Sequence, residues 1–90
     1  MKLTKTKARV LVFLSQSSQY NHFVAEMSRK LVIDYAYLLN ILGQMKNTGW
    51  VERYRLENKV FYKLTSTSPI GRAKEMLAKG QTNEVNEKWN

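Results

Sequence analysis

Residues 26–65 read EMSRKLVIDYAYLLNILGQMKNTGWVERYRLENKVFYKLT, and this stretch decides the fold. A short segment with helical apolar spacing leads to a break, and a second amphipathic segment then ends at Gly49. Two runs rich in aromatic and β-branched residues follow, over residues 50–56 and 60–64, with a polar tip at 57–59 between them. This order predicts two helices joined by a turn and then a β-hairpin.

The second amphipathic segment carries the clearest helical signal. Four apolar residues stand at i, i+3, i+4 and i+7, the spacing of one helix face: Leu38, Ile41, Leu42 and Met45. Asp34 is a suitable N-cap, and Gly49 supplies the left-handed residue that commonly ends a helix. We therefore expect a helix over residues 34–48 whose apolar face packs on the core.

The N-terminal third of the chain predicts two earlier helices. The first lies between residues 4 and 17, with Thr4 or Thr6 as its cap. Its apolar side consists of Ala8, Leu11 and Val12, together with either Leu14 or Ser15. The second covers residues 22–31, with Asn21 as its N-cap.

A serine–proline step marks the start of a last helix. Ser68 would cap this helix, and Pro69 would occupy its first turn, where the fixed φ of proline is compatible with a helix. We expect the helix over residues 70–79, with Gly80 as its end. Residues 81–90 are mostly polar and are expected to form a tail.

The chain is strongly basic. Its 90 residues carry a formal net charge of +8, which favours a polyanionic partner, either nucleic acid or an anionic membrane surface; solubility is the alternative explanation. The length fits a single domain with one modest core. No apolar run approaches the ~20 residues of a membrane span, and the run after Arg9 is too short for a signal peptide. We expect an intracellular protein that is not bound to a membrane.

Several chemistries have no matching motif in this sequence. It contains no cysteine and a single histidine, His22, which argues against disulfides and against a metal site. The serines lack Ser-His-carboxylate spacing, and neither a Gly-rich phosphate loop nor a paired-carboxylate motif is present. We expect neither enzymatic activity nor a cofactor.

These features resemble the winged helix-turn-helix DNA-binding proteins, close in style to the MarR-like and PadR-like transcription regulators. The resemblance covers about residues 5–79. Its helix-turn-helix anchors are Met27, Ser28, Leu31, Ile33, Leu38 and Ile41. Residues 49–53, GWVER, resemble the Gly-Leu-Val-Glu-Arg turn that leads into the wing. Leu64, Thr65 and Gly71 resemble the Leu-Thr-x-x-Gly that follows the wing, at a longer spacing.

The resemblance implies an α+β fold that is mainly α: three helices, a two-stranded β-hairpin wing and a C-terminal helix, in a domain of residues 1–80. It also implies double-stranded DNA as the partner, and a homodimer through the N- and C-terminal helices. The sequence departs from the pattern at Ser28, where alanine is usual, and at Val32, where the turn often has glycine. The wing is short for a MarR relative. Small archaeal winged-helix proteins, including basic chromatin-associated ones and virus-encoded regulators, are similar in size and wing length.

The side of helix 34–48 opposite its apolar face carries the candidates for base reading in the major groove. Asn and Gln side chains can pair bidentately with adenine, and a small residue lets a helix lie close to the groove floor. The candidates are Tyr35, Ala36, Tyr37, Asn40, Gln44 and Asn47. Simple solvation is the alternative role of the amides, and packing is the alternative for Tyr35, which lies nearer the apolar face.

The predicted wing carries a cluster of basic residues. In winged-helix proteins this hairpin follows the DNA backbone or enters the minor groove, and arginine suits a narrow minor groove. The wing candidates are Arg53, Arg55, Lys59 and Lys63, and further phosphate contacts are expected from Arg29 and Lys30 on the preceding helix. Glu52 and Glu57 dilute this charge, and a solvated strand surface is the alternative role.

Three functions fit this sequence. The first is a sequence-specific transcription regulator, expected to be a repressor in the cytoplasm at the nucleoid. The second is an architectural or chromatin protein that binds DNA without sequence preference. The third is a protein-interaction module that uses an aromatic surface formed by Tyr35, Tyr37, Tyr54 and Phe61. Loss of site discrimination on mutation of Asn40 and Gln44 would separate the first function from the second.

Overall fold

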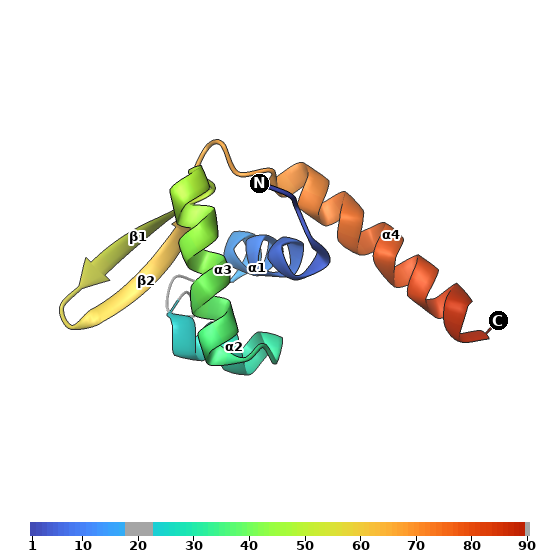
Figure 1. Ribbon diagram of the computed structural model, residues 1–90, viewed down its shortest axis with the longest axis horizontal. Coiled ribbons are helices and arrows are strands. Elements are labelled where there is room, and N and C mark those ends of the chain that lie inside the picture. Colours follow the sequence, from blue (N-terminus) through green and yellow to red (C-terminus); the bar gives the residue numbers. More distant parts are fainter. Residues whose placement is uncertain (18–22, 90) are drawn as a thin grey trace.

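The computed structural model describes residues 1–17 and 23–89. Within these residues the chain forms helices and one two-stranded antiparallel sheet, in the order α1 (Lys5–Gln16), α2 (Val24–Leu31), α3 (Tyr35–Thr48), β1 (Val51–Leu56), β2 (Lys59–Leu64) and α4 (Ile70–Trp89). Figure 1 shows the hairpin projecting from one side of the helical body and α4 extending from the other. The predicted mainly helical α+β layout with a β-hairpin wing is confirmed.

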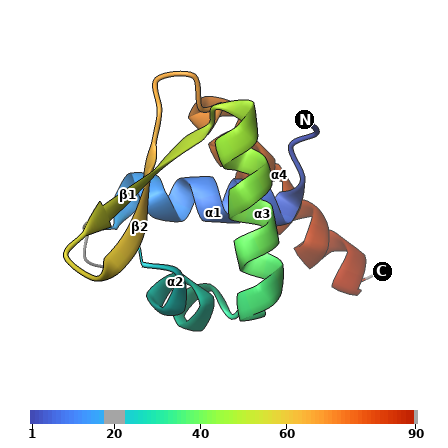
Figure 2. The ribbon, with the colours of Figure 1, turned by 60° about the vertical axis from the view of Figure 1, so that its left-hand side comes forward.

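The core lies between α1, α2 and α3, and the wing and α4 close it (Figure 2). The four residues predicted for the inner face of α3 are all buried: Leu38, Ile41, Leu42 and Met45. Val51 and Tyr62 enter the core from the wing, and Ala73 enters it from α4. The apolar spacing of α3 therefore identified the side of this helix that packs.

The buried side of α1 is wider than its sequence predicted. Ala8 and Leu11 are buried as expected, and so are Val10 and Leu14, whereas Val12 is only half-buried. The reason is that α1 packs against α4 on one side and against α2 and the wing on others. A helix enclosed by several elements buries more than one stripe of residues.

The predicted helix caps are confirmed at two sites. Thr4 Oγ1 accepts a hydrogen bond from the backbone N–H of Lys7 at 3.3 Å, so Thr4 caps α1. Asp34 Oδ2 accepts from the backbone N–H of Tyr37 at 3.0 Å and caps α3. α3 ends at Gly49 in the left-handed conformation, with φ 91°. Each of these caps satisfies a backbone group that the helix itself leaves unpaired.

The predicted start of α2 is wrong. The helix begins at Val24, after Phe23, which makes no side-chain cap; the predicted cap Asn21 lies outside the described residues. The backbone of Phe23 instead forms a β-bridge with Phe61 on the wing. Because this pairing requires an extended backbone, α2 cannot start earlier than the residue after it.

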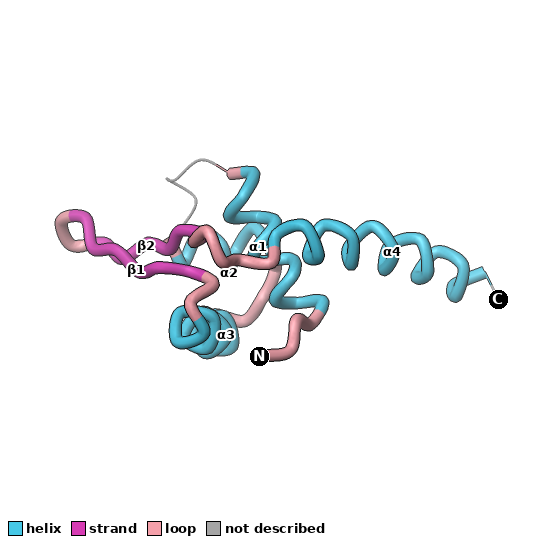
Figure 3. The backbone as a smooth tube through the Cα atoms, turned by 90° about the horizontal axis from the view of Figure 1, so that it is seen from above, coloured by secondary structure: helices cyan, strands magenta, loops and turns pink. Residues whose placement is uncertain are grey.

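The wing has a shorter tip than predicted. Val51 pairs with Leu64 at one end of the sheet and Leu56 with Lys59 at the other, so Lys59 belongs to β2 and the turn contains residues 57–58 alone. Glu57 has a positive φ of 58° in this turn. Figure 3 looks along α3 and shows the hairpin reaching beyond the helical body.

The predicted start of α4 at residue 70 is confirmed, and its predicted end at Gly80 is wrong. The helix begins at Ile70 and continues through Gly80 to Trp89, because residues 81–88 contain glutamine, glutamate and lysine, which favour helix, and no proline. At the start, the Ser68 hydroxyl oxygen is buried without a hydrogen-bond partner and does not cap the helix. The predicted polar tail over residues 81–90 is therefore helical as far as residue 89.

The turn between α2 and α3 contains a residue in a costly conformation. Val32 has φ 55° and ψ 53°, in the left-handed region, and its side chain is 87% exposed. Ser28, four residues before Val32, stabilises the turn: its backbone oxygen accepts from the N–H of Ile33 at 3.1 Å, and its hydroxyl donates to the Ile33 carbonyl at 2.6 Å. The turn thus has the geometry that usually takes glycine, although a β-branched residue occupies it.

Replacing Val32 with glycine is expected to raise the free energy of unfolding by about 1 kcal/mol. A left-handed conformation costs an L-residue roughly 1–2 kcal/mol, and the freer unfolded chain of glycine offsets part of the gain. Urea denaturation would measure the difference. Val32→Ala is the matched control, because it trims the exposed side chain but keeps Cβ. An equal gain from alanine would show that the backbone conformation is not the cause.

Candidate nucleic-acid interface

The outward side of α3 presents the residues that the sequence selected. Tyr37 is 54% exposed and Tyr35 is 50% exposed. The other four members of the set are also exposed: Ala36, Asn40, Gln44 and Asn47. The structure therefore places all six on the accessible surface of one helix, and Tyr35 does not enter the core.

Two of the amides on this helix are joined. Gln44 Nε2 donates a hydrogen bond to Asn40 Oδ1 at 2.6 Å. Between them lies Gly43, and a Cβ placed on this glycine would meet no atom within 4 Å. The surface around the amide pair is thus open, and nothing in the packing of the described residues requires a glycine at this position.

The two wing arginines lie on the face of the hairpin that turns toward the body. Arg53 is opposite the buried Tyr62, and Arg55 is opposite the half-buried Val60. Directly opposed residues of an antiparallel pair share one face of the sheet. Both arginine side chains are nevertheless exposed, and neither has an ion pair within residues 1–17 and 23–79. They remain available to an anionic partner.

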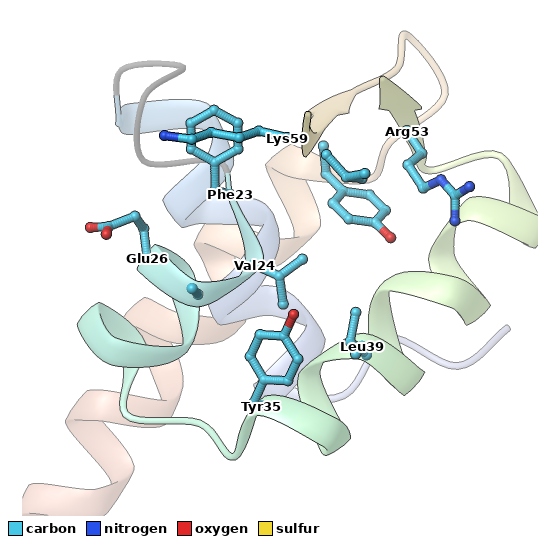
Figure 4. Close-up of a pocket in the computed structure, with 10 residues that line it drawn as sticks. Phe23, Val24, Glu26, Tyr35, Leu39, Arg53 and Lys59 are labelled. Atoms are coloured by element: carbon cyan, nitrogen blue, oxygen red, sulfur yellow. The ribbon is translucent and has the colours of Figure 1, made fainter. Parts of the chain in front are cut away.

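A groove of about 500 Å³ separates the wing from α3 and from the start of α2. Its lining includes Tyr35 and Leu39 from α3, Arg53 and Tyr62 from the wing, and Lys59 near the wing tip. In Figure 4 the Tyr35 ring and the Arg53 guanidinium approach this space from opposite sides. The groove therefore brings hydroxyl and cationic groups from two elements to one opening. Tyr62 and Leu39 were not among the predicted site residues; Tyr62 belongs to the core, whereas Leu39 is 41% exposed.

The outer face of the wing is an aromatic cluster. Tyr54 stacks on Phe61 with 5.4 Å between ring centroids, and Phe23 meets Phe61 edge-on at 6.1 Å. Two lysines lie over these rings: Lys59 Nζ is 5.4 Å from the Phe23 centroid, and Lys63 Nζ is 5.8 Å from that of Tyr54. These cation–π contacts hold both lysines against the wing surface. The cluster also fixes the wing to α2 through Phe23.

Lys63 is separated from the two wing arginines. Its cross-strand partner is Glu52, so it lies on the outer face of the sheet. On that face the Tyr54 hydroxyl donates a hydrogen bond to the Glu52 carboxylate. This bond raises the pKa of Tyr54 above its ordinary value, because ionisation of the hydroxyl would break it. Lys63 therefore lies beside Glu52 on the outer face of the wing and does not line the groove.

Arg29 and Lys30 lie in the last turn of α2, and both are exposed. Neither lines the groove, which takes its α2 residues from the first turn. Arg29 also forms an ion pair with Glu26. Its charge is therefore partly compensated, while that of Lys30 is not paired within the described residues.

A contact that the sequence did not predict links α1 to the helix-turn-helix. The Arg9 guanidinium donates a hydrogen bond from Nη2 to the backbone carbonyl of Leu31, the last residue of α2. A cation at a helix C-terminus is favourable, because the unpaired carbonyls there carry partial negative charge. Arg9 and Leu31 are 22 positions apart in the sequence, and local patterns of residues do not predict a contact at that separation.

The described residues contain no group of three or more His, Cys, Asp or Glu side chains able to hold a metal ion. In the same part of the chain, no helix is both long and apolar enough to cross a membrane.

The sequence of elements, from a helix-turn-helix through a β-hairpin to a closing helix, defines a winged-helix protein. Similar solved structures include a ZitR mutant from Lactococcus lactis, with a TM-score of 0.70 and 23% identity over 98% of this chain. A second ZitR mutant has a TM-score of 0.69 and 24% identity over 100% of this chain. The zinc-dependent MarR-family transcriptional regulator AdcR, in its Zn(II)-bound state, has a TM-score of 0.66 and 20% identity over 97% of this chain. No family model and no curated protein matches the sequence.

These likenesses confirm the winged-helix fold predicted from the resemblance to MarR-like proteins. This chain spans 60% of the length of the first ZitR mutant, 64% of the second and 60% of AdcR.

Proposed function

We propose that this protein is a sequence-specific regulator of transcription that binds double-stranded DNA and acts as a repressor at the nucleoid. The recognition helix, residues 34–48, would enter the major groove, and the wing, residues 50–64, would contact the backbone or the minor groove. One observation carries the proposal: the groove between α3 and the wing brings Tyr35, Arg53 and Lys59 to the same opening. The exposed amides of α3 extend along the same helix.

The chemistry of this surface matches duplex DNA. The major groove admits one α-helix, and amide side chains can contact base edges there. Guanidinium groups and hydroxyls suit phosphate oxygens, which fix the position of a protein on the duplex. The overall charge of +8 favours the encounter with a polyanion. The likeness in fold to AdcR, a MarR-family transcriptional regulator, also supports this function.

The proposal includes a homodimer formed through α1 and α4. These two helices pack together, and a second groove beside them, of about 480 Å³, exposes apolar side chains between basic ones. It is lined by Lys5, Arg9, Val12, Phe13, Gln16, Leu31 and Leu77. A two-fold axis at this surface would set two copies of α3 side by side. Half-sites one helical turn apart, about 34 Å, are then expected.

Selection of binding sites from random duplex DNA, at about 50 mM and about 200 mM salt, tests this function. We expect a palindromic motif that persists at the higher salt, with weaker affinity, because phosphate contacts release counterions. A flat selection profile with strong binding at low salt would favour the architectural alternative, which the charge alone also supports. Negligible binding even at low salt would reject both DNA functions and leave the interaction module.

A further inference from the structure

We propose that the groove between α3 and the wing receives the sugar–phosphate strand that separates the major groove of DNA from the minor groove. The hydroxyls of Tyr35 and Tyr62 bind phosphates of this strand beside Arg53. This inference rests on the proposed function, because it starts from a duplex that α3 and the wing contact together. Tyr35, predicted among the base-reading candidates, then holds the backbone, and Tyr62, a core residue, joins it.

The position of the groove points to the backbone strand. α3 and the wing form two of its walls, and the proposed function sets α3 in the major groove and the wing on the side of the minor groove. Neighbouring major and minor grooves of a duplex are separated by one sugar–phosphate strand. A protein that contacts both grooves at once must straddle that strand, so the strand passes through the space between α3 and the wing.

Tyr62 offers a hydroxyl that the fold leaves unused. The residue is only 4% exposed, and it lines the groove. Its hydroxyl makes no hydrogen bond within the described residues, yet it is not among the oxygens sealed from solvent without a partner. The hydroxyl therefore opens on the groove. Because the hydroxyl of a buried tyrosine usually has a hydrogen-bond partner, this one is placed to take a partner from outside the chain.

The charge around this hydroxyl suits an anion. Arg53 is the cross-strand partner of Tyr62 on the same face of the wing, and Lys59 lines the groove near the wing tip. The one carboxylate in the lining, that of Glu26, is paired with Arg29. The groove thus presents an excess of positive charge, which favours phosphate oxygens as partners for its hydroxyl donors.

Tyr35 supplies the second hydroxyl from the opposite wall. It is the first residue of α3, and Figure 4 shows its hydroxyl directed into the groove. Apolar side chains complete the lining, among them Val24, Leu39 and Val60. A phosphodiester strand carries anionic oxygens together with the carbon surface of its sugars, so both kinds of lining have a counterpart on it.

Removal of a single oxygen atom tests each hydroxyl. Tyr35→Phe and Tyr62→Phe are each expected to weaken binding about tenfold, because a hydrogen bond to a charged group contributes about that much. The loss should be equal on the selected site and on a duplex of scrambled sequence, since phosphates carry no sequence information. The slope of log affinity against log salt should stay at the wild-type value, because neither variant removes a charge. Fluorescence anisotropy titrations of the full chain measure these quantities.

Tyr54→Phe is the matched control. It removes the same atom from the outer face of the wing, where the hydroxyl donates to Glu52 and does not line the groove. Its affinity for DNA should equal that of the wild type. Tyr62→Phe should leave the melting temperature of the free protein unchanged, since its hydroxyl has no partner to lose within the described residues. An unchanged melting temperature excludes a folding defect as the cause of weaker binding.

A second measurement locates the phosphates. Methylphosphonate linkages, which carry no charge, replace the phosphates of the selected site one at a time. The wild type should lose about tenfold in affinity at one or two neighbouring positions, as expected for a lost charged contact. Tyr35→Phe and Tyr62→Phe should lose clearly less at those positions, because part of the contact is already absent.

The possible results separate this inference from the proposed function. Wild-type affinity in both hydroxyl variants, or a loss confined to the selected sequence, would overturn the inference and leave the proposed function standing. Equal losses on both duplexes, from a wild type without site preference, would support the phosphate contacts while the sequence-specific function failed. No binding of the wild type to duplex DNA would reject both.

Discussion

Replacing Leu38 with alanine is expected to lower the free energy of unfolding by about 3 kcal/mol. Leu38 lies on the inner side of α3 and has no exposed surface. Removal of a buried leucine side chain loses its transfer free energy and leaves a cavity, which together typically cost about 2–5 kcal/mol. Because the stability of a whole domain is only about 5–15 kcal/mol, this loss is a large part of the total.

The adjacent leucine is the control for this substitution. Leu39 is 41% exposed and borders the groove between α3 and the wing. Leu39→Ala changes the same atoms in the same helix, and we expect it to cost well under half as much, since fewer contacts are lost. Urea titration followed by circular dichroism gives both values. Equal losses at the two positions would contradict the orientation of α3.

Removing Arg53 and Arg55 together should weaken duplex binding by on the order of one hundredfold at moderate salt. Each arginine is exposed and lacks an ion pair within the described residues, and a charged hydrogen bond contributes on the order of tenfold in affinity. The slope of log affinity against log salt should fall by about one for each arginine, since each lost phosphate contact releases about one counterion fewer.

A double variant with the same change in charge provides the comparison. Lys74→Ala with Lys79→Ala removes two exposed positive charges from α4, outside the groove that lies between α3 and the wing. Its salt slope should remain close to that of the wild type. Fluorescence anisotropy titrations at several salt concentrations measure all three proteins. An equal fall in slope for the α4 variant would mean that overall charge, and not the wing, determines binding.

Features set by nearby residues were predictable from the sequence. The inner face of α3 follows from four apolar residues in helical spacing, and its two ends follow from Asp34 and Gly49. The wing follows from two short runs rich in aromatic and β-branched residues, with a polar tip between them. In each case the physical cause lies within one element, so a short window of sequence contains it.

Features set by distant residues were not predictable. Phe23 is extended because it pairs with Phe61, and this pairing moved the start of α2. The bond from Arg9 to the carbonyl of Leu31 joins two helices in a way that no local pattern encodes. The continuation of α4 past Gly80 reflects the residues that follow, although glycine is a frequent helix end.

The candidate site was partly predictable. Sequence spacing placed five of the six candidates on or beside the outward side of α3 and Tyr35 nearer the apolar face, and the structure has all six exposed. The groove that joins this helix to the wing could not be predicted, because it depends on how the hairpin docks. The bond between Asn40 and Gln44 could have been anticipated, since residues four apart are neighbours on a helix surface.

Gly43 lies in the middle of α3, where glycine is an unfavourable residue for the helix. A chain selected for stability alone would carry alanine at this position, because alanine favours a helix by about 1 kcal/mol over glycine and its methyl group would meet no neighbouring atom. The glycine therefore lowers the stability of the helix, and no close packing contact of the described residues requires it. Gly43 leaves a stretch of α3 without a side chain in the middle of the helix, next to the exposed amides of Asn40 and Gln44.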